Sequence, residues 1–207
     1  MQTGRPATPL FVSQTLLHLR AISDFVALLG LLWGVALGLA VAHFGHNDIG
    51  LATQIVGAAL LQKLPSLTVA MVLAVRLVLF QSLERDGNAG LGADMLAAVW
   101  TSCVALVVFV ALALLGLAVG IESDAAGMAH IWLDQIGQSY SVWELPRLFA
   151  RMCLIALGLG WIGHVDRLLL RTRHENLSRS ATRLLWLMII AVLVIEVFDS
   201  YLNGMPT

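Results

Sequence analysis

Two long runs without Asp, Glu, Lys or Arg, residues 25–44 and 95–121, constrain the fold of this chain more than any other feature. A helix needs about 20 mostly apolar residues to cross the hydrocarbon core of a bilayer. Only 12% of the residues are charged and 59% are hydrophobic, whereas in a soluble domain about a quarter are charged. The sequence therefore predicts an all-α integral membrane protein, because backbone groups in lipid must be satisfied within each segment.

Three further apolar runs bring the number of predicted spans to five. The second run contains Lys63, Pro65 and Arg76, the fourth contains Arg151, and the fifth ends near two acidic residues. The five predicted transmembrane helices cover about residues 25–44, 55–80, 95–121, 148–165 and 184–201 of a single domain, residues 25–203.

Basic residues are concentrated in alternate connecting segments, and this asymmetry predicts an orientation. If the N-terminus lies in the cytoplasm, the outer segments contain Arg147 alone. The cytoplasmic segments then contain eight arginines: Arg5, Arg20, Arg85, Arg167, Arg171, Arg173, Arg179 and Arg183. By the positive-inside rule, we expect a cytoplasmic N-terminus and a C-terminus on the outer side.

Two segments outside the spans have the character of a membrane interface. Residues 10–23 mix apolar and polar positions, which favours an interfacial helix within the N-terminal segment 1–24. The outer segment 122–147 carries Trp132 and Trp143, and aromatic residues are enriched at membrane–water boundaries. We therefore expect a second, short helix on the outer face.

The first span carries glycines at four-residue intervals, Gly30, Gly34 and Gly38, so that they share one helix face. Small residues in this pattern let two helices approach closely. Two interpretations remain open from the sequence. The face packs inside the bundle, or it is shared with a partner chain or a groove.

Lys63 and Arg76 are charges within the second predicted span. A charge at membrane depth costs about 2.5–3.5 kcal/mol on insertion scales and normally faces protein or water. Pro65 lacks a backbone donor, so we expect a kink or break beside Lys63. Both side chains could instead extend to the membrane surface, and Arg76 could pair with Glu84.

The fifth span places arginines before its apolar run and acids near its end. Arg183 and Glu196 are thirteen residues apart, about 20 Å along one helix, so they cannot pair with each other. Each must meet water, a headgroup or another helix. The arginines could simply orient the span, and Glu196 could simply mark its end.

Several function classes find no support in the sequence. There is no Walker loop, nucleophile elbow or HExxH motif, so we expect no catalytic residues. His43 and His46 lack a third ligand, which argues against a metal site. A net charge of −1 offers no basic face for nucleic acid. Cys103 and Cys153 fall in apolar runs and are expected to be packing residues rather than a disulfide.

Three stretches resemble the MlaE/YrbE permeases, the membrane subunits of bacterial ABC lipid transporters that work with MCE-domain proteins. They are GVALGLA in the first span, VGAALLQKLPSLTVAMVLAVRLVLFQSLE in the second, and SRSATR, which holds Arg179 and Arg183, before the fifth. Arg76 and Glu84 keep the family's spacing, and Arg151 lies at a similar interval. Glu196 stands where the family usually has Asp.

The resemblance implies an MlaE-like fold and a permease dimer with a lipid-binding cavity between the subunits. The residues expected at this cavity are Gly34, Leu37, Gly38, Val41, Lys63 and Met71. The charges expected to matter are Arg76, Glu84, Arg151, Arg179, Arg183 and Glu196. The implied partners are a second permease subunit, a cytoplasmic ABC ATPase that binds ATP and Mg²⁺, an MCE-domain periplasmic protein and lipid, at the bacterial inner membrane. This chain itself is expected to bind no cofactor.

The sequence also departs from that family. Gln62 and Lys63 replace an Arg-Glu pair, and only SLERDGNAGLGAD joins the second and third spans. The family has a longer connection there, whose coupling helix docks on the ATPase. This shortening favours an alternative, a scaffold subunit that does not transport. A second alternative is an LptF/LptG-like permease, because LLQKLP followed by SLERDG resembles the second span of that family.

Overall fold

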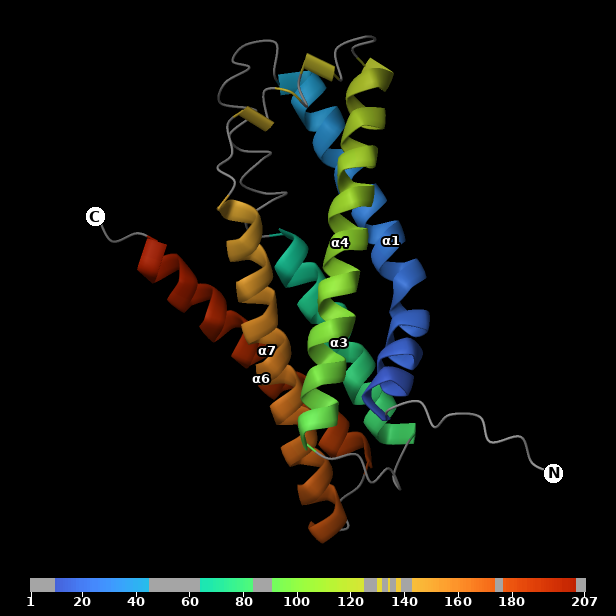
Figure 1. The fold of residues 1–207 in the computed structure, drawn as a ribbon, viewed down its shortest axis with the longest axis vertical. Helices are drawn as coiled ribbons and strands as arrows, with labels where there is room; N and C mark the ends of the chain where they lie inside the picture. The colour runs from blue at the N-terminus through green and yellow to red at the C-terminus, as the bar shows by residue number, and fades with distance from the viewer. Residues whose placement is uncertain are drawn as a thin grey trace, which may run out of the picture.

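The computed structural model describes residues 10–44, 64–83, 91–124, 130–131, 134, 137–138, 143–173 and 177–203. Five helices account for nearly all of them: α1 (Leu10–Phe44), α3 (Leu64–Leu83), α4 (Leu91–Asp124), α6 (Glu144–Arg173) and α7 (Leu177–Asn203). The described ranges contain no strand. Successive described helices run in opposite directions, so that α1, α4 and α7 point one way and α3 and α6 point the other way (Figure 1). The predicted all-helical class is confirmed.

Three segments are long and apolar enough to cross a membrane, namely Thr15–His43, Leu91–Ser123 and Glu144–Asp166. Shorter apolar helical segments, Leu64–Val78 and Thr182–Ile195, lie in α3 and α7. Large apolar side chains are exposed on every helix, among them four tryptophans within the helices: Trp33, Trp100, Trp161 and Trp186. Such a surface is consistent with a membrane protein, because lipid rather than water covers it favourably.

Helix α1 is one continuous helix of 35 residues, whereas the sequence predicted a separate interfacial helix before the first span. No glycine or proline interrupts residues 10–24, so nothing in the chain breaks the helix there. At 1.5 Å per residue α1 is about 52 Å long. Since a bilayer core is about 30 Å thick, part of α1 must extend beyond it.

Part of the second predicted span, residues 55–63, lies outside the described residues. The described helix starts at Leu64, which places Pro65 in its first turn. A proline is tolerated there because the first N–H groups of a helix have no partner within the helix. In the predicted outer-face helix, positions 130–131, 134 and 137–138 are helical. Gln138 Nε2 donates a hydrogen bond to Asp134 Oδ2 there, at 2.9 Å.

The glycine face of α1 packs against α4. A Cβ added to Gly30 would lie 2.7 Å from the Phe109 carbonyl oxygen, and one added to Gly34 would overlap the backbone of Ala113. From the other side, a Cβ on Gly120 would lie 2.6 Å from the Val35 carbonyl oxygen. Of the two interpretations of the glycine face, the structure therefore bears out packing inside the bundle.

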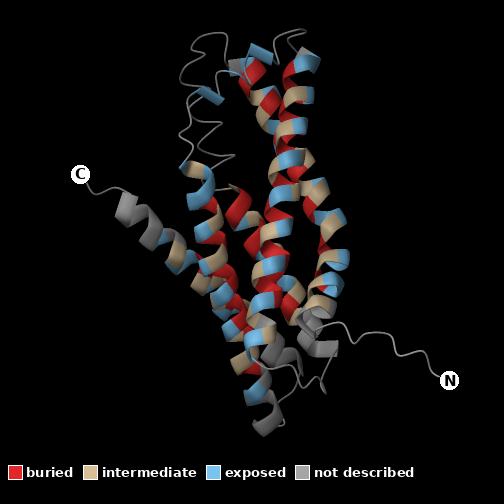
Figure 2. Ribbon diagram, in the orientation of Figure 1, coloured by how far each residue is buried: buried red, intermediate tan, exposed pale blue. Residues whose placement is uncertain are grey.

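Helix α3 contacts each of the other four described helices and therefore lies at the centre of the bundle. Its buried residues Val69, Leu73 and Leu77 join a core that also includes the fully buried Phe109 of α4 and Met152 of α6. Buried positions face between the helices and exposed positions face outward (Figure 2). Helix α7 crosses the bundle obliquely, and its C-terminal end lies away from α1 and α4 (Figure 1).

The connections divide the bundle into two ends. The start of α1, the end of α3, the start of α4, the end of α6 and the start of α7 lie together (bottom of Figure 1). We call this the basic end, because the arginine-rich segment from Arg167 to Arg183 joins α6 to α7 there. The arrangement agrees with the predicted order of five helices, of which three are long and apolar enough to cross a membrane.

Two cysteine side chains meet between α4 and α6. The Sγ atoms of Cys103 and Cys153 are 3.7 Å apart, and both thiols are free. A disulfide needs about 2.05 Å between the sulfurs. The two residues therefore pack as thiols, as the sequence predicted, but a small adjustment would allow a bond.

Mild oxidation should link Cys103 to Cys153 within one chain, because their sulfurs already touch. Copper phenanthroline added to the purified protein should remove the mass of two hydrogen atoms and block both thiols from maleimide after denaturation. Cys153→Ala is the control and should leave Cys103 reactive. If both thiols of the wild type stayed reactive after oxidation, the contact between α4 and α6 would be wrong.

Candidate functional site

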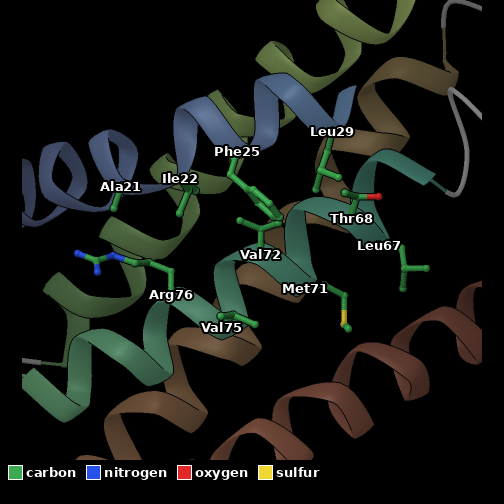
Figure 3. A pocket seen from close by; sticks show the side chains of 10 residues that line it. All are labelled: Ala21, Ile22, Phe25, Leu29, Leu67, Thr68, Met71, Val72, Val75 and Arg76. Carbon is green, nitrogen blue, oxygen red and sulfur yellow. The ribbon is translucent and has the colours of Figure 1, made fainter. Parts of the chain in front are cut away.

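An open groove runs between α1 and α3, with a volume of about 520 Å³ (Figure 3). We call it the α1–α3 groove. Ten residues line it: Ala21, Ile22, Phe25 and Leu29 of α1, and Leu67, Thr68, Met71, Val72, Val75 and Arg76 of α3. The volume falls within the range of about 300–1,000 Å³ typical of small-molecule sites.

The groove follows from helical spacing on two antiparallel helices. Residues four apart lie on one face of a helix, as Ala21, Phe25 and Leu29 do on α1. Pairs of neighbouring residues at the same interval line the other wall, ending with Val75 and Arg76. In Figure 3 Phe25 lies opposite Val72, with Leu29 near Thr68 at one end and Ala21 near Arg76 at the other.

The rim and floor of the groove differ in exposure. Ile22 is buried, while Phe25, Met71 and Val75 at the rim are 54%, 40% and 46% exposed. Since the rim is apolar as well as exposed, the groove opens sideways, toward the medium that surrounds the helices. For a membrane protein that medium is lipid at the level of the spans.

The polar groups of the groove lie toward its two ends. Arg76 is half-buried on α3, and its guanidinium extends toward α1 beside Ala21 (Figure 3). Thr68, two turns earlier on α3, carries the other polar side chain of the lining. Arg76 is the only charged residue among the ten that line the groove, and it lies on the side of the basic end.

The structure brings only part of the predicted cavity set into this groove. Met71 lines it, as does Arg76 from the predicted charges. Gly34 and Gly38 are buried against α4 instead, and Val41 is 2% exposed in the core. Leu37 packs against the same core. These four residues are thus occupied by packing within the chain.

The predicted charges lie in several different places. Arg151 is buried in α6, with 7% of its surface exposed. Arg183 donates a hydrogen bond of 2.8 Å to Asp166 of α6, so this arginine meets another helix rather than only water. Arg179 and Glu196 lie on α7, but their side chains are outside the described part. Lys63 and Glu84 lie outside the described residues.

Two features of the site were missed from the sequence. Phe25 and Leu29 form the α1 wall of the groove, and their four-residue spacing was the available signal, but spacing does not say which helix they face. Asp166, 3% exposed, was missed as the partner of Arg183. Its signal was an acid within an arginine-rich segment at a predicted span end.

The described residues contain no group of three or more His, Cys, Asp or Glu side chains that could hold a metal ion. The lining of the α1–α3 groove offers a binding site with an apolar body and a cation toward one end. Comparisons with protein-family models, curated proteins and solved structures gave no match to this chain.

Proposed function

We propose that this chain is a membrane subunit that binds lipid in the α1–α3 groove and serves as the permease of an ATP-driven lipid transporter. The observation that carries the proposal is the groove itself, an apolar channel open at its side with Arg76 toward one end. An acyl chain matches the apolar walls, and a polar head matches the charged end. The resemblance to MlaE/YrbE permeases supports the transport role.

The proposal includes the partners that such a permease requires. A second permease subunit, a cytoplasmic ABC ATPase and an MCE-domain periplasmic protein would complete the transporter in a bacterial inner membrane. The arginines at the basic end support a cytoplasmic N-terminus by the positive-inside rule. ATP and Mg²⁺ would be bound by the ATPase, and this chain would contribute the lipid site.

A scaffold role within the same kind of complex is a second candidate. The observation that favours it is the short link between α3, which ends at Leu83, and α4, which begins at Leu91. Only residues 84–90 lie between these two helices, which is fewer than the connection that carries the coupling helix in MlaE/YrbE permeases. If this chain bound the ATPase without a second permease subunit, that result would argue against the scaffold role.

Lipid recovery tests the proposed function. The full chain, purified in mild detergent, should retain lipid by native mass spectrometry. Val72→Trp should lower the bound fraction about tenfold, because a loss of roughly 1.4 kcal/mol in contacts suffices for that change. The indole would fill the middle of the groove opposite Phe25.

Leu115→Trp is the matched control. Leu115 is 56% exposed on α4 and does not line the groove, so the same enlargement should leave lipid recovery unchanged. A wild-type chain that carries no lipid, or two variants with equal lipid recovery, would refute the assignment of the groove.

A further inference from the structure

We propose that the occupant of the α1–α3 groove is a single-chain amphiphile with an anionic headgroup, bound with its head beside Arg76. The inference rests on the proposed function, because it specifies which lipid the same groove takes. Three properties of the groove carry it: its volume, the placement of its polar groups, and its position relative to the basic end.

The volume of the groove suits one acyl chain. If each methylene needs about 30 Å³, the share of a water molecule in the liquid, then 520 Å³ holds about 17 such groups. Two chains of that length would need about twice the volume. A diacyl lipid could therefore place only one of its chains between α1 and α3, and the second chain would remain outside.

The charge in the lining selects the headgroup. Apart from Thr68, the residues that line the groove with Arg76 are apolar, so the guanidinium is the one charge that a bound molecule would meet there. A carboxylate or phosphate accepts charge-assisted hydrogen bonds from a guanidinium, and these are stronger than bonds to a neutral hydroxyl. A neutral amphiphile would gain the apolar contacts alone.

The position of Arg76 determines how the molecule lies. Arg76 is two turns closer than Thr68 to the end of α3, which lies at the basic end of the bundle (Figures 1 and 3). The head is thus on the side of the basic end, and the tail runs toward Leu67. The exposed rim residues Phe25 and Met71 border the long, open side of the groove. The acyl chain of the ligand can therefore enter sideways from the lipid leaflet.

A comparison of three probes tests the inference on the delipidated full chain in detergent, with binding followed by native mass spectrometry. Palmitate has one chain and an anionic head, hexadecanol has the same chain and a neutral head, and dipalmitoyl phosphatidylglycerol is anionic with two chains. Palmitate should bind the wild type about tenfold more tightly than hexadecanol, as expected for one added charge-assisted interaction. The two-chain lipid should displace palmitate poorly.

Variants of Arg76 locate the headgroup. Arg76→Gln should remove the preference for palmitate and leave hexadecanol binding unchanged, whereas Arg76→Lys should keep most of the preference because it keeps the charge. Arg20→Gln is the matched control, since Arg20 is exposed on α1 near the same end but does not line the groove. Circular dichroism and thermal unfolding check that each variant folds.

The outcomes separate this inference from the proposed function. If palmitate and hexadecanol bind with equal affinity, or if Arg76→Gln changes the affinity of neither, the preference for an anionic headgroup is refuted. Lipid binding in the groove would still hold. If the two-chain lipid displaces palmitate fully, the single-chain assignment is wrong. If no probe binds and Val72→Trp leaves lipid recovery unchanged, the groove is not a lipid site and the proposed function is refuted as well. If Val72→Trp instead alters the oligomeric state, a second chain occupies the groove and the inference is overturned.

Discussion

Gly34→Ala should destabilise the folded chain by about 1–3 kcal/mol, the usual cost of adding a methyl group where a packed interior has no room. The new Cβ would overlap the carbonyl of Ala113, which is backbone and cannot rotate away. Relief therefore requires α1 and α4 to separate along their shared face. Gly34→Val should cost more, because it adds further atoms at the same close approach.

Thermal unfolding in detergent, followed by circular dichroism, measures the effect. A loss of about 2 kcal/mol lowers the Tm by roughly 4–8 °C in a chain of this size. Gly158→Ala is the matched control, because a Cβ at Gly158 of α6 meets no atom within 4 Å. That change should be neutral or stabilising by up to about 1 kcal/mol, since alanine favours a helix over glycine. Equal melting temperatures for the two variants would contradict the packing of α1 on α4.

Arg183→Gln should be more harmful still, at about 3–5 kcal/mol, the usual cost of removing one member of a buried ion pair. The Asp166 carboxylate is 3% exposed and accepts the 2.8 Å hydrogen bond from Arg183. Asp166→Asn should cost clearly less, because the Arg183 side chain is 36% exposed and can turn toward water. The prediction is therefore an asymmetry between two variants of the same pair.

Chemical and thermal unfolding of both single variants tests that asymmetry. Arg179→Gln removes an equal charge four residues earlier on α7 and controls for the general loss of basic character near the membrane. The double variant Asp166→Leu with Arg183→Met should recover much of the stability, because an apolar pair leaves no buried charge. Equal losses of unfolding free energy for Arg183→Gln and Arg179→Gln would show that the ion pair with Asp166 does not stabilise the fold beyond the general effect of a positive charge.

Of the predicted cavity residues Met71 lines the α1–α3 groove, and so does Arg76, which was predicted as a functional charge. The spacing of Gly34 and Gly38 indicated a face on which helices could approach closely, but the sequence left open what would cover it, and the expected place of both residues at a lipid cavity is not what the structure shows. In the structure α4 covers it, with Gly116 and Gly120 providing the complementary small residues. Periodicity identifies a helix face, but many faces of a bundle share the same composition.

The last span illustrates the same limit for charges. Arg183 and Glu196 could be excluded as partners, because about 20 Å of helix separates them. The helical hairpin of α6 and α7 then brings Asp166 to Arg183 across 17 residues of sequence. No local pattern encodes that contact, since it depends on how far α6 extends before the chain turns.

The sequence by itself determined that this chain is helical and suited to a membrane. The length and polarity of each apolar run are local properties, and they decide whether a segment can cross the hydrocarbon core as a helix. The tertiary structure decided which faces meet: α1 on α4 through glycines, α6 on α7 through an ion pair, and α1 beside α3 across an open groove. The physical reason is that helices in lipid gain little from hydrophobicity when they associate. Steric fit and a few polar contacts select the partners, and these depend on residues far apart in the chain.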